Sequence, residues 1–123
     1  LNQVDADVIT FESCSSGHID IAAIGKHITD KKVAIGMIDH HSLQVEKVDD
    51  IAANIREALK HIPPERLILC SDCGMGREGM SRRHARYKMV ALVQGTNIVR
   101  KELGLPEVEC LAADPRYSLV VQE

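Results

Sequence analysis

Aromatic residues are scarce in this 123-residue sequence, which has no tryptophan, two tyrosines and one phenylalanine. Its formal net charge is −3 with the histidines neutral, and its one dense basic cluster lies at residues 82–86. Proteins that bind nucleic acids usually present a basic face, often with aromatic rings on which bases stack. We therefore expect no nucleic-acid partner, and we interpret the basic cluster as a solvated helix face.

Long hydrophobic runs and targeting segments are also lacking. No apolar stretch approaches the roughly 20 residues of a membrane-spanning helix, and nothing resembles a signal peptide. We therefore expect a cytoplasmic protein with no membrane partner, whose four cysteines are free thiols or metal ligands rather than disulfides. The chain begins at Leu1 and runs quickly into a strand-like segment, so we expect it to be a piece of a longer protein.

Strand-like and helix-like patterns alternate along the chain. Strands are predicted over residues 4–11, 32–38 and 66–70, the second of them nearly continuous in apolar residues. Helices are predicted over residues 20–28, 45–61 and 81–103. The last helix carries a stripe of mostly apolar side chains on one side: Ala85, Met89, Leu92, Thr96, Val99 and Leu103. Beyond it, the tail is predicted to be irregular apart from a short apolar piece at residues 119–121.

This order predicts an α/β fold, a parallel β-α-β-α-β-α segment that forms one unit over residues 1–123. Three such units are too few to close a (β/α)₈ TIM barrel, which needs about 250 residues. They suit the C-terminal portion of such a barrel, and alone they would leave two sheet edges open.

Side chains of the acid, base or metal-ligand type follow each predicted strand. Glu12 follows the first strand and Asp39, His40 and His41 follow the second, while Asp72 and Cys73 follow the third. In α/β folds the carboxyl ends of parallel strands form the edge where active sites are built. Carboxylate, imidazole and thiolate are all zinc ligands, so the pattern favours a zinc site. The alternative is that these are exposed loop residues without a common role.

Two further motifs overlap the third strand end. Cys70 and Cys73 form a C-x-x-C pair, but no second pair completes a zinc knuckle, and a glycine-containing turn separates Cys73 from the helix that a redox pair requires. We interpret Cys70 as a small buried hydrophobe. Residues 74–79 also match G-x-G-x-x-G, but no strand with an acidic end follows about 20 residues later, so a dinucleotide site is disfavoured.

The motifs at the strand ends resemble a known family. Residues 7–12 read D-V-I-T-F-E and residues 39–42 read D-H-H-S, and P-P-E-R-L at residues 63–67 leads into D-C-G at residues 72–74. Together, over about residues 5–103, they resemble the last three β/α units of the C-terminal catalytic barrel of cobalamin-independent methionine synthase. Residues 75–86 and the tail are more similar to short relatives that consist of the barrel alone.

The resemblance implies a zinc-dependent methyltransferase that transfers a methyl group to homocysteine, giving methionine. Glu12 and Cys73 match zinc ligands of the family, and His41 matches its proton donor. Asp39 and Asp72 are candidates for orienting the ligands or contacting the substrate. The family's other two ligands belong to a His-x-Cys motif on an earlier strand, and this chain contains no His-x-Cys. We therefore expect the remainder of the barrel to be needed, and the isolated chain to be inactive.

Some residues depart from the family pattern. Residues 13–16 lack an arginine that is common there, and Cys70 and Ser71 replace an Asn-Pro pair. These departures leave the methyl donor open, as methyltetrahydrofolate or another donor. The thiol substrate, the oligomeric state and the roles of Cys14, Cys70 and His40 are open as well. The alternative functions are methylation of a different thiol by a member of the same superfamily, and a non-catalytic, truncated remnant.

Overall fold

The structure is a computed structural model that describes residues 1–15, 17, 19–77 and 79–114. Strands and helices alternate in the predicted order, and a short 3₁₀ helix follows. Their bounds are β1 (Val8–Phe11), α1 (Ile21–His27), β2 (Lys32–Ile38), α2 (Val48–Leu59), β3 (Leu67–Ser71), α3 (Arg82–Glu102) and η1 (Leu111–Ala113). The apolar piece expected at residues 119–121 lies outside the described residues.

Two predicted boundaries are wrong. The first strand begins at Val8 rather than at residue 4, because Val4 and Ala6 donate their backbone N–H groups to local turn bonds with Leu1 and Val4. Helix α2 begins at Val48 rather than at residue 45. The preceding residues form a loop whose Glu46 side chain reaches back to the end of β2.

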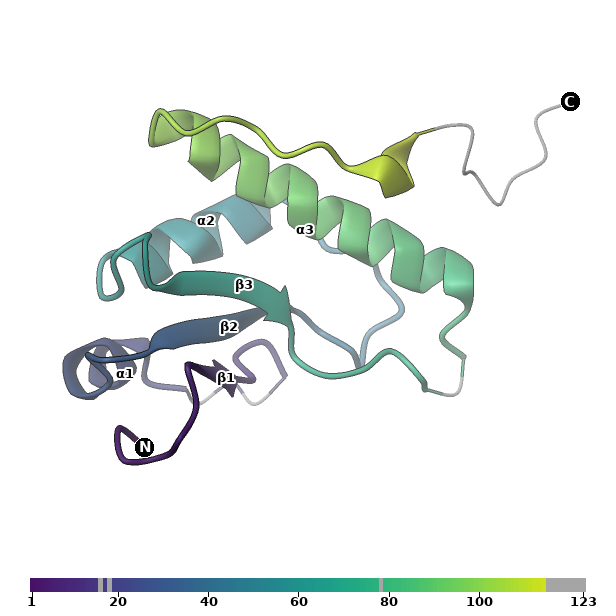
Figure 1. The fold of residues 1–123 in the computed structure, drawn as a ribbon. Helices are drawn as coiled ribbons and strands as arrows, with labels where there is room; N and C mark the ends of the chain where they lie inside the picture. The colour runs from purple at the N-terminus through teal and green to yellow at the C-terminus, as the bar shows by residue number, and fades with distance from the viewer. Residues whose placement is uncertain (16, 18, 78, 115–123) are drawn as a thin grey trace, which may run out of the picture.

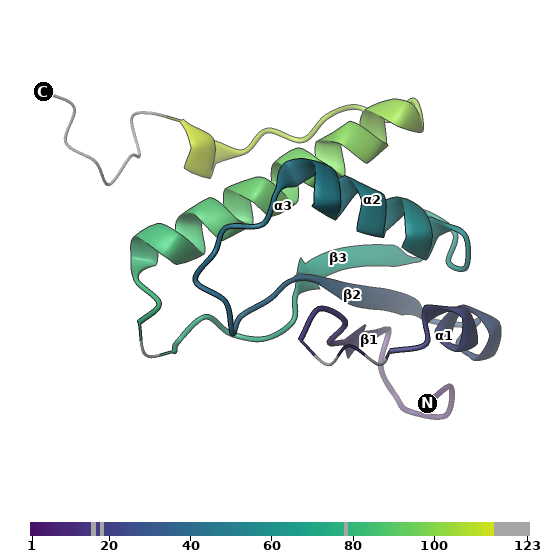
Figure 2. The same ribbon diagram turned by 180° about the vertical axis from the view of Figure 1, so that it is seen from behind.

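The three strands form a parallel sheet in the order β1-β2-β3, so that β2 is central. Residues 33–38 of β2 are all buried, as predicted from their continuous apolar run. Helices α2 and α3 lie together on one side of the sheet, and all strands point the same way, towards one edge (Figures 1 and 2). This edge is where the predicted site residues lie.

The hydrophobic core lies between the sheet and the two longer helices. Helix α2 buries Ile51, Ala52 and Ile55, whose spacing in the sequence places them on one face of the helix. The stripe predicted for α3 is partly wrong, because Met89 and Leu103 are 39% and 46% exposed.

The rotation of α3 is set by its close packing against α2. The buried residues of α3 include Lys88, Ala91, Leu92, Gly95 and Val99. A Cβ on Gly95 would lie 2.6 Å from Ile51 Cγ2, so only glycine allows the two helices to approach so closely at this point. The predicted stripe missed this face because it contains a lysine and a glycine, residues that are not ordinarily assigned to a hydrophobic core.

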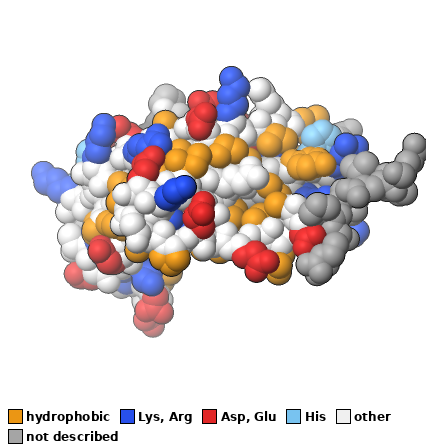
Figure 3. Space-filling model, turned by 90° about the horizontal axis from the view of Figure 1, so that it is seen from above, with side chains coloured by type: hydrophobic (Ala, Val, Ile, Leu, Met, Phe, Trp, Pro, Cys, Tyr) orange, Lys and Arg blue, Asp and Glu red, His pale blue; other side chains and the backbone are white. Residues whose placement is uncertain are grey.

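The segment after α3 folds back along that helix. Gly104, with φ +73°, follows the C-cap Leu103, so the helix ends close to the predicted position. Arg86 then donates to the Ala112 carbonyl at 2.9 Å, and the Asn97 side chain makes two hydrogen bonds of 2.8 Å with the backbone of Val108. Seen from above, hydrophobic side chains gather along the middle of this face between charged ones (Figure 3). In the described part of the chain, no helix has the length and apolar character needed to cross a membrane.

Candidate metal and catalytic site

The candidate residues follow the strand ends at one edge of the sheet, as predicted. Ser71 of β3 pairs with Ile38 of β2, and the next residue, Asp72, donates its backbone N–H to the Ile38 carbonyl at 3.0 Å. Asp39 follows β2 and Glu12 follows β1 at the same edge. Glu12 and Cys73 are exposed, whereas Asp72 is buried. The functions of these residues stay predictions.

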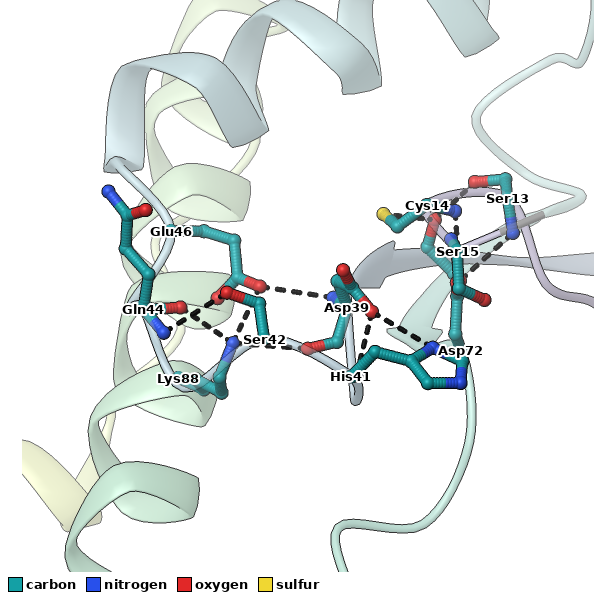
Figure 4. A network of polar contacts seen from close by, with 11 residues as sticks. Ser13, Cys14, Ser15, Asp39, His41, Ser42, Gln44, Glu46, Asp72 and Lys88 are labelled. Carbon is teal, nitrogen blue, oxygen red and sulfur yellow. Dashed lines mark hydrogen bonds and ion pairs between the residues drawn. The ribbon is translucent and has the colours of Figure 1, made fainter. Parts of the chain in front are cut away.

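Asp72 joins two of the strand ends (Figure 4). Its Oδ1 accepts the backbone N–H groups of Ser13 at 2.9 Å and Cys14 at 3.2 Å, and its Oδ2 accepts that of Ser15 at 2.6 Å. Burial by itself raises the pKa of Asp72, but the hydrogen bonds from Ser13, Ser15 and Cys14 together outweigh it and hold the pKa below its ordinary value. The ionised carboxylate therefore fixes the loop that follows Glu12 to the residue that precedes Cys73.

Gly36 of β2 makes room for this contact. A Cβ on Gly36 would overlap Oδ1 of Asp72. The Gly36 carbonyl accepts a hydrogen bond from the Ser13 hydroxyl and a longer one, of 3.4 Å, from the Cys14 thiol. The loop after β1 thus lies across Gly36 to reach Asp72, and any side chain at this position would block it.

We expect Gly36→Ala to lower the free energy of unfolding by about 1–3 kcal/mol, the usual cost of overpacking a filled site. The added methyl group must displace either Asp72 or the main chain of β2. Gly76→Ala is a matched control, because nothing lies within 4 Å of a Cβ on Gly76. Urea unfolding of the two variants checks this expectation, and equal midpoints would contradict the close contact.

Asp39 orients His41 in the loop after β2. Its Oδ1 accepts the His41 backbone N–H at 2.8 Å and lies 3.4 Å from Nδ1 of the same residue. The His41 side chain is 49% exposed. With Nδ1 turned towards the carboxylate, Nε2 is the ring nitrogen available to a substrate. An oriented, accessible imidazole of this kind can deliver or accept a proton.

The imidazole ring of His40 packs against that of His41. The two ring centroids are 3.9 Å apart with the planes tilted by 42°, and His40 is buried. Among the described residues, His40 Nδ1 has no hydrogen-bond partner. Donor atoms of Asp39, His40 and His41 all lie within 4.8 Å of one another, so this trio is a second arrangement that could hold a metal ion.

Two of the remaining cysteines are poorly suited to bind a metal. Burial, followed by the negative charges of Asp72, Glu46 and Asp39, raises the pKa of the Cys14 thiol to about 12. Burial and Asp72 also raise the pKa of Cys70. Metal ions bind the thiolate form, which these environments disfavour. Cys14, Cys70, Cys73 and Cys110 are not joined in disulfides in the structure.

The sequence did not lead us to predict an ion pair between α3 and the loop that joins β2 to α2. Lys88 of α3 is 0% exposed and donates to Glu46 Oε1 at 2.8 Å. The same carboxylate oxygen accepts the Asp39 backbone N–H at 3.0 Å. The spacing of the sequence could have indicated that Lys88 is buried. Lys88 lies on the same helical face as four buried residues that follow it at helical intervals: Ala91, Leu92, Gly95 and Val99.

Comparison with known proteins places these features in a family. Residues 1–96 match the family described as cobalamin-independent synthase, catalytic domain. The chain belongs to this family. The resemblance found in the motifs at the strand ends is thereby confirmed.

Named relatives within the cobalamin-independent synthase family agree with this assignment. Methionine synthase of Saccharolobus solfataricus is 33% identical over 102 residues, which are 83% of this chain and 30% of the relative. Methionine synthase of Thermococcus kodakarensis is 38% identical over 78 residues, 63% of this chain and 23% of the relative. The chain thus spans about a third or less of the length of these relatives.

A solved structure of the same family has a similar fold. It is a B12-independent methionine synthase from Shewanella sp. W3-18-1 in complex with selenomethionine. This chain matches it with a TM-score of 0.73 and 34% identity, over 83% of this chain and 29% of that one. The predicted fold class, a parallel β-α-β-α-β-α segment of a TIM barrel, is confirmed.

Proposed function

We propose that this chain forms part of the active site of a zinc-dependent methyltransferase that converts homocysteine to methionine. The observation that carries the proposal is the contact of Asp72 with residues 13–15, which ties the end of β1 to the end of β3. Glu12 and Cys73 flank this contact on either side. The choice of reaction is supported by the membership of the chain in this family and by the methionine synthases among its relatives.

Glu12 and Cys73 are the residues that would hold zinc. They offer a carboxylate and a thiol at the same edge of the sheet, both exposed, and this donor set suits zinc. A tetrahedral site needs further ligands, which the remainder of the barrel would provide. Bound zinc would lower the pKa of the substrate thiol and so favour its nucleophilic form at neutral pH.

His41 is the residue that would supply the proton. As a methyl group moves to the substrate sulfur, the leaving group of the donor gains negative charge and must be protonated. Asp39 holds His41 through the backbone N–H and faces Nδ1, so that Nε2 is free to carry a proton to the leaving group. Asp72 would act indirectly, by positioning the two loops that carry Glu12 and Cys73.

The direct test uses this chain together with the remainder of its barrel. The protein is supplied with homocysteine and with methyltetrahydrofolate or another methyl donor, and methionine is measured. We expect methionine to form, to disappear after complete chelation of zinc, and to return when zinc is restored. Turnover that survives chelation would contradict the zinc site. Absence of methionine with every donor would contradict the reaction and favour methylation of another thiol or a non-catalytic role.

A further inference from the structure

We propose that Lys88, acting through Glu46 and the main chain of Asp39, is a positioning residue for His41. This inference rests on the proposed function of His41 as the proton donor. Lys88 lies on α3, whereas His41 lies in the loop between β2 and α2. The two are linked by a chain of hydrogen bonds rather than by direct contact (Figure 4).

The Lys88 ammonium group donates hydrogen bonds to both ends of the loop between β2 and α2. It donates to the Asp39 carbonyl at 3.1 Å, to the Gln44 carbonyl at 2.7 Å and to Glu46 Oε1 at 2.8 Å. An ammonium group has three N–H donors, so all of them are engaged. Because His41 lies between Asp39 and Gln44, these bonds hold the loop at points on either side of the imidazole.

Asp39 makes hydrogen bonds through its backbone N–H, its backbone carbonyl and its carboxylate. Its backbone N–H donates to Glu46 Oε1 at 3.0 Å and its carbonyl accepts from Lys88. Its carboxylate in turn accepts the His41 N–H and faces Nδ1. A shift of the Asp39 main chain would therefore carry the carboxylate, and with it the imidazole, away from its position.

Stability alone does not account for a lysine at this point. An ammonium group that is 0% exposed has lost its hydration, and buried ion pairs can often be replaced by apolar side chains without loss of stability. The neighbouring residues on the stripe, Ala91 and Leu92, belong to the hydrophobic core. What an apolar side chain could not supply are the three directed hydrogen bonds that fix the loop.

The first test replaces Lys88 in the protein that contains the rest of the barrel. We expect Lys88→Met to lower kcat about 10- to 100-fold, because misplacement of a catalytic group by about 1 Å can cost that much. KM for homocysteine should stay within about twofold, since His41 acts on the leaving group rather than on the thiol. Arg56→Met is the matched control. Arg56 also pairs with a carboxylate between α2 and α3, that of Glu102, but at an exposed position away from the loop. Its kcat should not change.

A second comparison separates positioning from simple destabilisation. Lys88→Met leaves the Glu46 carboxylate buried without its partner, and its Oε2 has no hydrogen bond in the described structure even with lysine present. The double variant Lys88→Met, Glu46→Gln removes that uncompensated charge, so its thermal stability should recover towards the wild type. Its kcat should stay low, because the bonds to the carbonyls of Asp39 and Gln44 are still missing. Recovery of kcat together with stability would overturn the proposal.

A third comparison asks whether Lys88 acts through His41. In a His41→Ala background, Lys88→Met should lower kcat no further, because the group that it positions is already gone. Additive losses would overturn the proposal. Hydrogen exchange of the amides of residues 39–46 gives a readout without turnover, and it should quicken in Lys88→Met but not in Arg56→Met. Unchanged exchange would contradict this inference, whereas a wild-type protein that forms no methionine would contradict the proposed function instead.

Discussion

Cys73→Ala is expected to lose zinc and methyl transfer together. Removal of a residue that only orients a ligand typically lowers metal affinity 10- to 100-fold, so loss of a ligand should lower it by more than about 100-fold. Cys73 is exposed at the carboxyl edge of the sheet and follows the buried, ionised Asp72. Zinc content and methionine formation are measured on the same preparation of the protein that contains the full barrel.

Cys70→Ala is the matched control for this variant. Cys70 lies three residues earlier, within β3, and burial raises its pKa. It should keep both zinc and activity, with at most a modest loss of stability from the smaller side chain. Full zinc occupancy in Cys73→Ala would show that Cys73 is not a ligand. Zinc loss in both variants would point to general disruption of the strand end.

His41→Ala is expected to give the opposite pattern, with zinc retained and turnover lost. A positioned general acid typically contributes about 10²- to 10⁴-fold to the rate, and kcat should fall within that range. The imidazole is 49% exposed and its backbone N–H, which alanine keeps, makes the hydrogen bond to Asp39. The fold should therefore be little disturbed. Steady-state kinetics with metal analysis of the same samples checks both parts.

His61→Ala is the control for His41→Ala, because His61 is an exposed histidine just past the end of α2 and distant in the chain from the strand-end loops. It should match the wild type in kcat and in zinc content. If His41→Ala kept wild-type kcat, another group would have to protonate the leaving group. If it lost zinc, His41 would belong with Asp39 and His40 in the alternative metal cluster.

Much of the fold could be predicted because its signals are local. The continuous apolar run of residues 33–38 indicates a strand buried on both faces, and β2 is such a strand. The spacing of Ile51, Ala52 and Ile55 indicates an amphipathic helix with this face in the core, as found in α2. Parallel strands bring their carboxyl ends to one edge, so the neighbourhood of Glu12, Asp39 and Asp72 follows from topology alone.

The parts that could not be predicted depend on contacts between distant residues. The Asp72 carboxylate accepts backbone hydrogen bonds from residues 13–15, and the absence of a side chain at Gly36 makes room for this contact. Nothing in the local sequence of these segments indicates it. A Cβ on Gly25 would overlap the His61 carbonyl, so glycine is needed for α1 to pack near the end of α2. Lys88 was missed because a lysine is ordinarily assigned to solvent.

The position of zinc tests the central claim most directly. Crystals of the protein that contains this chain and the rest of the barrel are measured at the zinc absorption edge. We expect one anomalous peak about 2.3 Å from Cys73 Sγ and about 2.0–2.2 Å from a carboxylate oxygen of Glu12, the distances usual for these ligands. A peak beside Asp39, His40 and His41 instead, or no bound zinc in an active preparation, would contradict the assignment of Glu12 and Cys73 as the metal ligands.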